Sequence, residues 1–185
     1  MTAIIFPGQG SQYLNMSMDF NENFDVARKV FQEIEDSTQI NIRKIISENP
    51  LDNLNQTIYT QISIFSASMA IYKSLLSEIG NEIIKPKILL GHSLGEYSAL
   101  AAGNLINIAD ASMLIKKRGE LMHSSIEPNV SGMAAIIGKN SNFINDVIKK
   151  NNLKVVIAND NSPMQVVVSG LIEDIINSEQ VFSEN

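Results

Sequence analysis

One pentapeptide, Gly-His-Ser-Leu-Gly at residues 91–95, constrains the fold of this chain more than any other stretch. Residues 87–90 before it predict a short buried strand, and the Ala- and Leu-rich residues 94–102 predict a helix. A Gly-x-Ser-x-Gly turn between a strand and a helix is typical of a nucleophile elbow, whose close backbones leave no room for Cβ atoms at the glycines. Ser93 would be exposed at the positive end of the helix, with the Leu94 NH directed at a developing oxyanion. The alternative, a chance Gly-Ser-Gly turn, is disfavoured by the flanking strand and helix.

The composition excludes several classes of protein. With 185 residues, 44% hydrophobic and 18% charged, the chain is long enough for one globular domain, or for one and part of a second. The net charge of −6 argues against a general nucleic-acid surface, so nucleic acid is not expected as a partner. Cysteine is absent, and the two histidines, His92 and His123, form no cluster with a carboxylate at ligand spacing. We therefore expect no disulfide, no metal and no other cofactor.

The N-terminus and the apolar stretches predict a cytoplasmic protein. Met1 and Thr2 lead directly into a strand-like run, without the basic segment of a signal peptide. The most apolar helical stretch, residues 62–76, is interrupted by serines and by Lys73, which is typical of a core helix and not of a membrane span. We therefore expect no membrane partner.

The N-terminal strand is followed by a loop that contains two glycines. Residues 2–6 predict a short apolar strand that Pro7 ends, and Gly-Gln-Gly-Ser-Gln follows at residues 8–12. The spacing matches neither a P-loop nor a dinucleotide-binding fingerprint. The glycines fit an ordinary turn; in the functional interpretation, Gln9 offers its backbone NH to the same oxyanion as Leu94.

Helical patterns fill most of the segment between this loop and the elbow. An apolar face predicts a helix over residues 25–37 and a shorter one over residues 41–48. Residues 53–60 predict a polar loop, and Thr60 is expected to cap a long helix that Gly80 closes.

The helix predicted over residues 107–125 carries a charge on its apolar side. Asn107 is expected to cap it. The predicted apolar stripe consists of Ala111, Leu114, Ile115, Leu121 and Met122. Arg118 falls on this stripe, where a guanidinium requires an anion; the alternative is an arginine that extends to the rim or pairs with a structural carboxylate. His123 fits a partly exposed structural histidine that the helix dipole stabilises.

After Pro128 the order of predicted elements changes. Strands are predicted over residues 133–137, 153–158 and 165–168, and helices over residues 142–150 and 171–177, with the polar residues 159–163 as a loop. The order β-α-β-β-α corresponds to a ferredoxin-like split unit without its last strand. We therefore expect a boundary near residues 127–131 that separates a subdomain of residues 1–127 from one of residues 131–185.

A set of motifs together resembles the malonyl-CoA:acyl carrier protein transacylases, the acyltransferase family of fatty-acid synthesis. In the family's order, they are Phe6–Gln12, Gly91–Leu100, Arg118–Gly119 with Met122, Met133–Gly138, and Asn161–Pro163 followed by Gln165–Val167. They span nearly the whole chain, and their combination is specific. Ordinary α/β-hydrolases share only the serine pentapeptide.

The resemblance implies a fold, a reaction and a set of site residues. The implied fold is α/β, with an α/β-hydrolase-like large subdomain and an inserted ferredoxin-like small subdomain, both incomplete in this chain. The implied reaction transfers a malonyl group from malonyl-CoA to the phosphopantetheine thiol of acyl carrier protein, with Ser93 as nucleophile. The backbone NH groups of Gln9 and Leu94 would form the oxyanion hole. Arg118 and Gln9 would bind the substrate, with the guanidinium paired to the malonyl carboxylate.

The family's general-base histidine has no counterpart among these residues, because family members run considerably further. His92 stands beside the nucleophile, and neighbours on a sharp elbow point apart, so it is poorly placed to take the Ser93 proton. His123 matches no catalytic residue of the family. The chain alone is therefore expected not to turn over at the family's rate. Two alternatives stay open: an inactive remnant or module that binds acyl carrier protein or coenzyme A, and a serine hydrolase of the esterase or lipase class, which would have no use for a buried Arg118.

Overall fold

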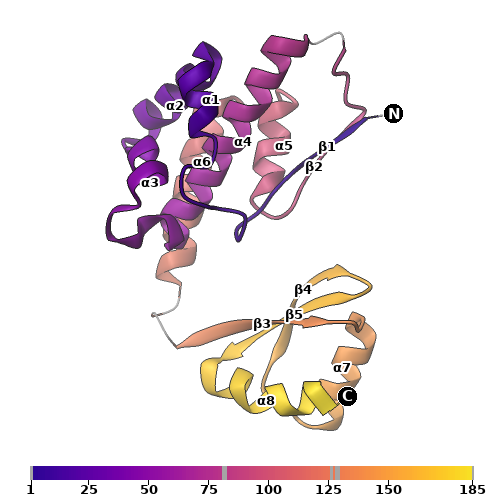
Figure 1. Cartoon of the computed structure of the whole chain (residues 1–185). Coiled ribbons are helices and arrows are strands. Elements are labelled where there is room, and N and C mark those ends of the chain that lie inside the picture. The colour runs from indigo at the N-terminus through magenta and orange to yellow at the C-terminus, as the bar shows by residue number, and fades with distance from the viewer. Residues whose placement is uncertain (1, 81–82, 126, 128–129, 185) are drawn as a thin grey trace. The chain divides into compact units, whose positions relative to one another are not determined.

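The computed structural model describes residues 2–80, 83–125, 127 and 130–184, which form two compact units (Figure 1). The first unit comprises Met1–Ser124 and the second Ser125–Asn185. This division lies just before the boundary expected near residues 127–131, part of which falls outside the described residues.

The first unit combines a two-stranded parallel sheet with helices. Its elements are β1 (Ala3–Phe6), α1 (Met18–Asn23), α2 (Asp25–Thr38), α3 (Ile42–Glu48), the 3-10 helix η1 (Pro50–Asn55), α4 (Thr57–Ile79), β2 (Ile88–Gly91), α5 (Gly95–Ala102) and α6 (Ile108–Ser124). β1 pairs with β2 from Ala3 opposite Ile88 to Phe6 opposite Gly91. Because the strands are parallel, both end at the same edge of the sheet, and the loops that follow them meet there.

Helix α4 is the central element of this unit (Figure 1). Every residue from Thr60 to Ala70 is buried, so this half of the helix is enclosed on all sides. Helices α2, α5 and α6 contact it. A buried serine hydroxyl can find its hydrogen-bond partner within the helix: the Ser66 hydroxyl donates to the Ile62 carbonyl at 2.7 Å.

The start of α4 differs from the sequence prediction. Thr60 is not a cap: it lies fully buried inside the helix, and its hydroxyl contacts the carbonyl oxygens of Leu54 and Gln56 at 2.7 and 2.9 Å. Residues 53–60, predicted as a polar loop, include the end of η1 and the first turn of α4. The Asn49 side-chain oxygen accepts the Leu54 NH at 2.7 Å and so ties η1 to the residue that precedes it. The sequence analysis predicts no helix between the loop after the first strand and residue 25, whereas the structure forms helix α1 there.

The buried stripe of α6 is narrower than predicted. Its buried positions are Ala111, Ser112, Ile115 and Gly119, which follow one face of the helix. The predicted positions that are about half exposed are Leu114, Leu121 and Met122. The expected cap is confirmed, because the Asn107 side-chain oxygen accepts the Asp110 NH at 2.7 Å. The small residues on the buried face allow α6 to approach α4 closely.

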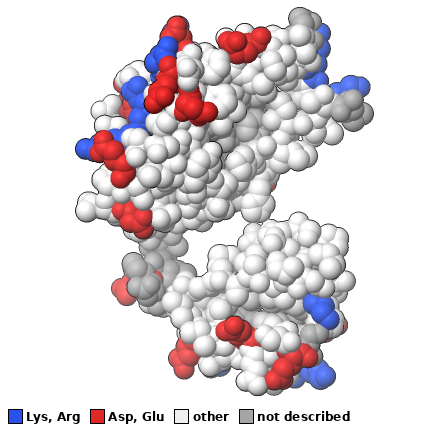
Figure 2. Space-filling view, viewed as in Figure 1, with Lys and Arg blue, Asp and Glu red and all other residues white. Residues whose placement is uncertain are grey.

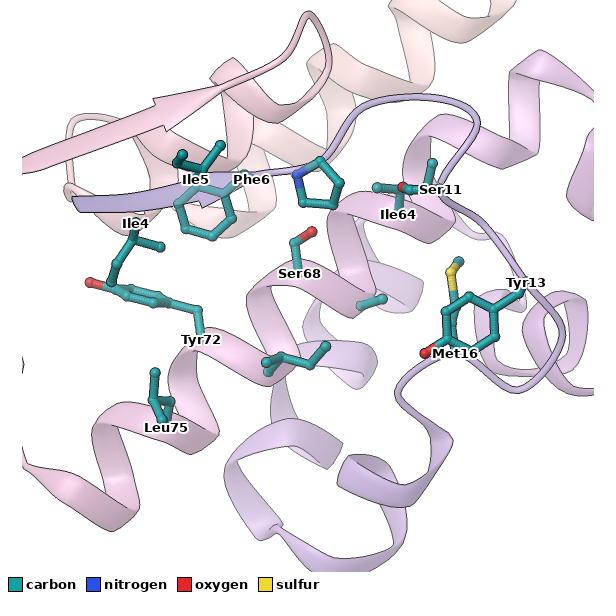
Figure 3. Close-up of a pocket in the computed structure, with 13 residues that line it drawn as sticks. Ile4, Ile5, Phe6, Ser11, Tyr13, Met16, Ile64, Ser68, Tyr72 and Leu75 are labelled. Atoms are coloured by element: carbon teal, nitrogen blue, oxygen red, sulfur yellow. The ribbon is translucent and has the colours of Figure 1, made fainter. Parts of the chain in front are cut away.

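An apolar groove of about 240 Å³ lies between β1 and α4 (Figure 3). Ile5 on the strand is 70% exposed, and Leu75 on the helix is 37% exposed. The ring of Tyr72 meets that of Phe6 edge-on, with 5.8 Å between centroids, and burial raises the pKa of the Tyr72 phenol. None of the described residues that line the groove is charged, so apolar surface of this unit stays open to solvent.

The second unit is a three-stranded antiparallel sheet with two helices (Figure 1). Its elements are β3 (Ser131–Ile137), α7 (Ser141–Lys150), β4 (Val156–Ser162), β5 (Gln165–Leu171) and α8 (Ile172–Glu184), and the strand order is β3-β5-β4. Ile144, Val155, Val166 and Val168 form its buried core.

Several predicted elements of this unit differ in extent from the structure: β4 begins at Val156 and not at residue 153, and β5 continues beyond residue 168 to Leu171. Residues 159–162, predicted as part of a loop, belong to β4, because Ser162 already pairs opposite Gln165 and leaves a tight hairpin turn. The Asn161 side chain donates to the Gln165 side chain at 3.1 Å, so a polar residue is accommodated in the pairing. Helix α8, predicted over residues 171–177, continues to Glu184.

Charge is unevenly spread over the surface of the first unit. On the face shown in Figure 2, acidic and basic side chains gather over α1 to α3, and the centre of the unit is uncharged. Within the described part of the chain, none of the helices is both long and apolar enough to cross a lipid bilayer.

Candidate active site

Ser93 stands on the sharp turn between β2 and α5. Its φ of 52° lies in the left-handed region, which is strained for a residue with a side chain and which is characteristic of a nucleophile elbow. The turn is fixed by two backbone hydrogen bonds, from the Gly95 NH to the His92 carbonyl at 3.0 Å and from the Glu96 NH to the Ser93 carbonyl at 3.2 Å. The side chain of Ser93 is exposed, whereas Leu94 is buried.

The elbow glycines are required by close backbone contacts. A Cβ added to Gly91 would lie 1.9 Å from the Gly95 carbonyl carbon, and a Cβ added to Gly95 would lie 2.2 Å from the Phe6 carbonyl oxygen. No side chain can occupy such positions without displacing backbone. The end of β1, the elbow and the start of α5 are therefore packed backbone to backbone.

The loop after β1 lies against the elbow. The His92 NH donates to the Phe6 carbonyl at 3.2 Å, and a Cβ added to Gly8 would lie 2.6 Å from the His92 carbonyl oxygen. Gln9 thus follows Gly8, which lies directly against His92, the residue before Ser93. The Gln9 side chain donates through Nε2 to the Thr57 hydroxyl at 3.1 Å.

Arg118 reaches the same place from α6. Its Nη2 donates to Ser93 Oγ at 2.8 Å, and its Nη1 donates to Gln61 Oε1 at 2.5 Å. The guanidinium carbon lies 6.0 Å from the centroid of the Tyr97 ring. Arg118 is half-buried, and among the described residues its guanidinium takes part in no ion pair. The structure therefore places beside the serine hydroxyl a cation that pairs with no carboxylate of the described residues.

The two histidines occupy different surroundings. His92 is exposed, and its Nδ1 would lie 2.8 Å from a Cβ added to Gly8, so its ring lies against the loop after β1. His123 is exposed in the last turn of α6. In the described part of the chain, His, Cys, Asp and Glu side chains form no group of three or more that could hold a metal ion.

Two residues that contact the site were missed by the sequence analysis. Gln61 and Thr57 lie one turn apart on α4, and each hydrogen-bonds one of the predicted site residues. These contacts are not evident from the sequence, because Gln61 lies 57 positions from Arg118 and Thr57 lies 48 positions from Gln9. The available signal was Gln61 itself, an uncharged amide directly before the most apolar helical stretch, residues 62–76.

Comparison with known proteins identifies the family. Residues 3–183 match the model of the acyl transferase domain. The chain belongs to this family. A polyketide biosynthesis malonyl CoA-acyl carrier protein transacylase from Bacillus velezensis is 35% identical over 183 residues, which are 98% of this chain and 60% of that protein. The malonyl CoA-acyl carrier protein transacylase of Haemophilus influenzae is 34% identical over 170 residues, 91% of this chain and 54% of that protein.

Solved structures of the acyltransferase family are similar over almost the whole chain. The malonyl CoA-acyl carrier protein transacylase of Clostridium perfringens has a TM-score of 0.88 at 33% identity, over 98% of this chain and 57% of that one. A complex of a type II polyketide acyl-carrier protein with its malonyl-transacylase also has a TM-score of 0.88 at 33% identity, over 98% of this chain and 59% of that one. The similarity confirms a mixed α/β fold. The chain thus spans a little over half the length of these relatives.

Proposed function

We propose that the protein transfers a malonyl group from malonyl-CoA to the phosphopantetheine thiol of acyl carrier protein, through an ester on Ser93. One observation carries this proposal: the guanidinium of Arg118, which forms no ion pair among the described residues, lies 2.8 Å from the hydroxyl of a serine on a strained elbow. The serine is suited to acyl transfer, and the cation is suited to an acyl group that ends in a carboxylate.

The reaction proceeds in two balanced steps. Ser93 Oγ attacks the thioester carbonyl of malonyl-CoA, the C–S bond breaks, and coenzyme A leaves as a thiol with the proton from the serine. The carrier thiol then attacks the ester, and its proton returns to Ser93. The backbone NH groups of Gln9 and Leu94 are assigned to the oxyanion of each tetrahedral intermediate.

Arg118 distinguishes this function from ester hydrolysis. In a malonyl ester of Ser93, one methylene separates the ester carbonyl from the free carboxylate, so the carboxylate stays close to the serine. A guanidinium already at that serine can pair with it through two parallel hydrogen bonds. An esterase for neutral substrates would keep an uncompensated cation at its nucleophile, which is costly.

We also propose a fold type for each of the two units. The parallel pair β1-β2, joined through helices and followed by an elbow, supports an α/β-hydrolase-like subdomain for residues 1–127. The strand order β3-β5-β4 with two helices supports a ferredoxin-like subdomain for residues 131–185.

Intact-mass measurement tests the acyl-enzyme. After mixing with malonyl-CoA, a longer form of the protein that contains this chain and supplies a general base is expected to gain the mass of one malonyl group. Ser93→Ala should remove the adduct, and Ser98→Ala, which changes a buried serine on the following helix α5, should keep it. An adduct that survives in Ser93→Ala would contradict the proposal. Binding of malonyl-CoA without any adduct would favour a binding module instead.

A further inference from the structure

Gln61 is a polar side chain with no exposed surface, in a stretch of α4 that is otherwise apolar or small. A buried amide is destabilising unless its oxygen and its NH₂ group both find partners. Its Oε1 accepts from Arg118 Nη1 at 2.5 Å, and its Nε2 donates to Met122 Sδ at 3.2 Å. Both partners come from α6, so Gln61 links the two helices at the level of the site.

The orientation of this amide follows from the chemistry of its partners. A guanidinium has donors only, so the amide must present its oxygen to Arg118. The NH₂ group then faces the Met122 thioether, a weak acceptor. The bond to Arg118 is charge-assisted, and its acceptor is shielded from water, which makes it stronger than an ordinary amide contact.

This contact fixes one end of the guanidinium fork. Nη1 is held by Gln61 and Nη2 by Ser93, so the plane of the group and the direction of its remaining N–H bonds are set before substrate arrives. The helices lie close at this point: a Cβ added to Gly119, next to Arg118, would lie 3.1 Å from the Ile58 Cα. The close packing restricts how far α6 can shift relative to Gln61.

We infer that Gln61 is a positioning residue that orients the Arg118 guanidinium toward the carboxylate of the substrate. The substrate part of this inference rests on the proposed malonyl transfer, whereas the orientation itself does not. Thr57, one turn earlier on α4, holds the Gln9 side chain. One face of α4 thus contacts both polar side chains assigned to the substrate.

The orientation is tested by nuclear magnetic resonance of the arginine side chains. In Gln61→Met, which keeps the length of the side chain but removes the acceptor, the Arg118 guanidinium is expected to rotate faster about the Nε–Cζ bond than in the wild type. The matched control is Gln32→Met, because Gln32 Oε1 accepts from Arg43 Nη2 at 2.9 Å on the surface of α2; this variant should leave the Arg118 signal unchanged. Gln61→Leu serves as a second variant if Gln61→Met does not fold.

Calorimetric binding of malonyl-CoA and acetyl-CoA separates the two proposals. Gln61→Met is expected to bind malonyl-CoA about 10- to 100-fold more weakly than the wild type and acetyl-CoA equally well. Guanidinium rotation as slow in Gln61→Met as in the wild type would overturn the inference, and so would an equal loss of both esters. If rotation accelerates but the wild type does not prefer malonyl-CoA, the positioning role stands and the proposed malonyl specificity fails.

Discussion

Arg118 Nη2 donates a hydrogen bond to Ser93 Oγ across 2.8 Å, although the two residues lie on different elements and 25 positions apart. The donor is the cation assigned to the substrate carboxylate, and the acceptor is the atom assigned to nucleophilic attack. A carboxylate that pairs with the guanidinium therefore competes with the serine for the same N–H group. Recognition of the acyl group and release of the nucleophile are thus coupled in one contact.

Arg118→Ala is expected to impair malonyl transfer far more than acetyl transfer. Removing one partner of a desolvated charge pair costs about 2–5 kcal/mol, and acetyl lacks the carboxylate that makes the pair. The measurement is the acylation rate of Ser93 with each coenzyme A ester, followed by mass. Arg118→Lys is the control for charge: it should recover part of the malonyl rate but not the bidentate geometry. Equal losses for both esters would show that Arg118 is structural.

Gly95→Ala is expected to destabilise the first unit by about 1–3 kcal/mol or more, because its Cβ would meet the Phe6 carbonyl oxygen at 2.2 Å. Backbone on both sides of this contact has to move. Chemical denaturation measures the free energy of unfolding. Gly103→Ala is the matched control at the end of the same helix, where the nearest atom would lie at 3.3 Å, and its effect should be much smaller. A similar loss in both variants would contradict the close packing of the elbow.

Elements with a strong local signal could be predicted from the sequence. The elbow strand, its helix and the Asn107 cap follow from residues that are adjacent in the chain, and the structure confirms that they form. The predicted burial of the strand was wrong, because Ile88 and Leu90 are about half exposed. The start of α4 could not be predicted, because Thr60 resembles a cap locally while tertiary packing buries it inside the helix. The polar end of β4 was missed for a related reason: pairing with β5, and not local propensity, makes residues 159–162 a strand.

The site was predictable to the extent that motifs mark it. Ser93 and Arg118 were singled out from the sequence, and the structure brings their side chains together. Gln61 carries no motif signal, because its importance comes from a partner 57 positions away. Burial and hydrogen bonding across helices are tertiary properties, so such a residue emerges only from the three-dimensional structure.

The groove between β1 and α4 is expected to bind hydrophobic probes. Ile5 is 70% exposed there, beside other apolar side chains, and surfaces of this kind favour association. Ile5→Lys should lower the fluorescence of a bound hydrophobic dye and reduce self-association in analytical ultracentrifugation. Leu51→Lys is the control, since Leu51 is 90% exposed but lies outside the groove. An unchanged signal in Ile5→Lys, or an equal decrease in both variants, would show that the groove is not the association surface.

The final prediction concerns the proton of Ser93. A serine hydroxyl is a weak nucleophile at neutral pH and needs a base within hydrogen-bond reach. The 185 residues contain two histidines, His92 and His123. The ring of His92 lies against Gly8, and His123 is exposed at the end of α6. We therefore expect neither histidine to serve as the base, and His92→Gln or His123→Gln should leave the acylation rate of this chain unchanged.

The lack of a general base is expected to lower the malonyl-transfer rate of the chain by a large factor. In subtilisin, removal of the base lowers turnover by on the order of 10⁶-fold, and the remaining rate comes from the oxyanion hole and substrate binding. A reduction of similar size relative to a complete family member is expected in a malonyl transfer assay of the purified chain. Adding a separately produced segment of a complete relative that carries a histidine should raise the rate, and Ser93→Ala should abolish the gain. Near-normal transfer by the chain alone that is lost in Ser93→Ala would instead contradict the expectation that neither histidine serves as the base, because the serine would then be activated without any added segment.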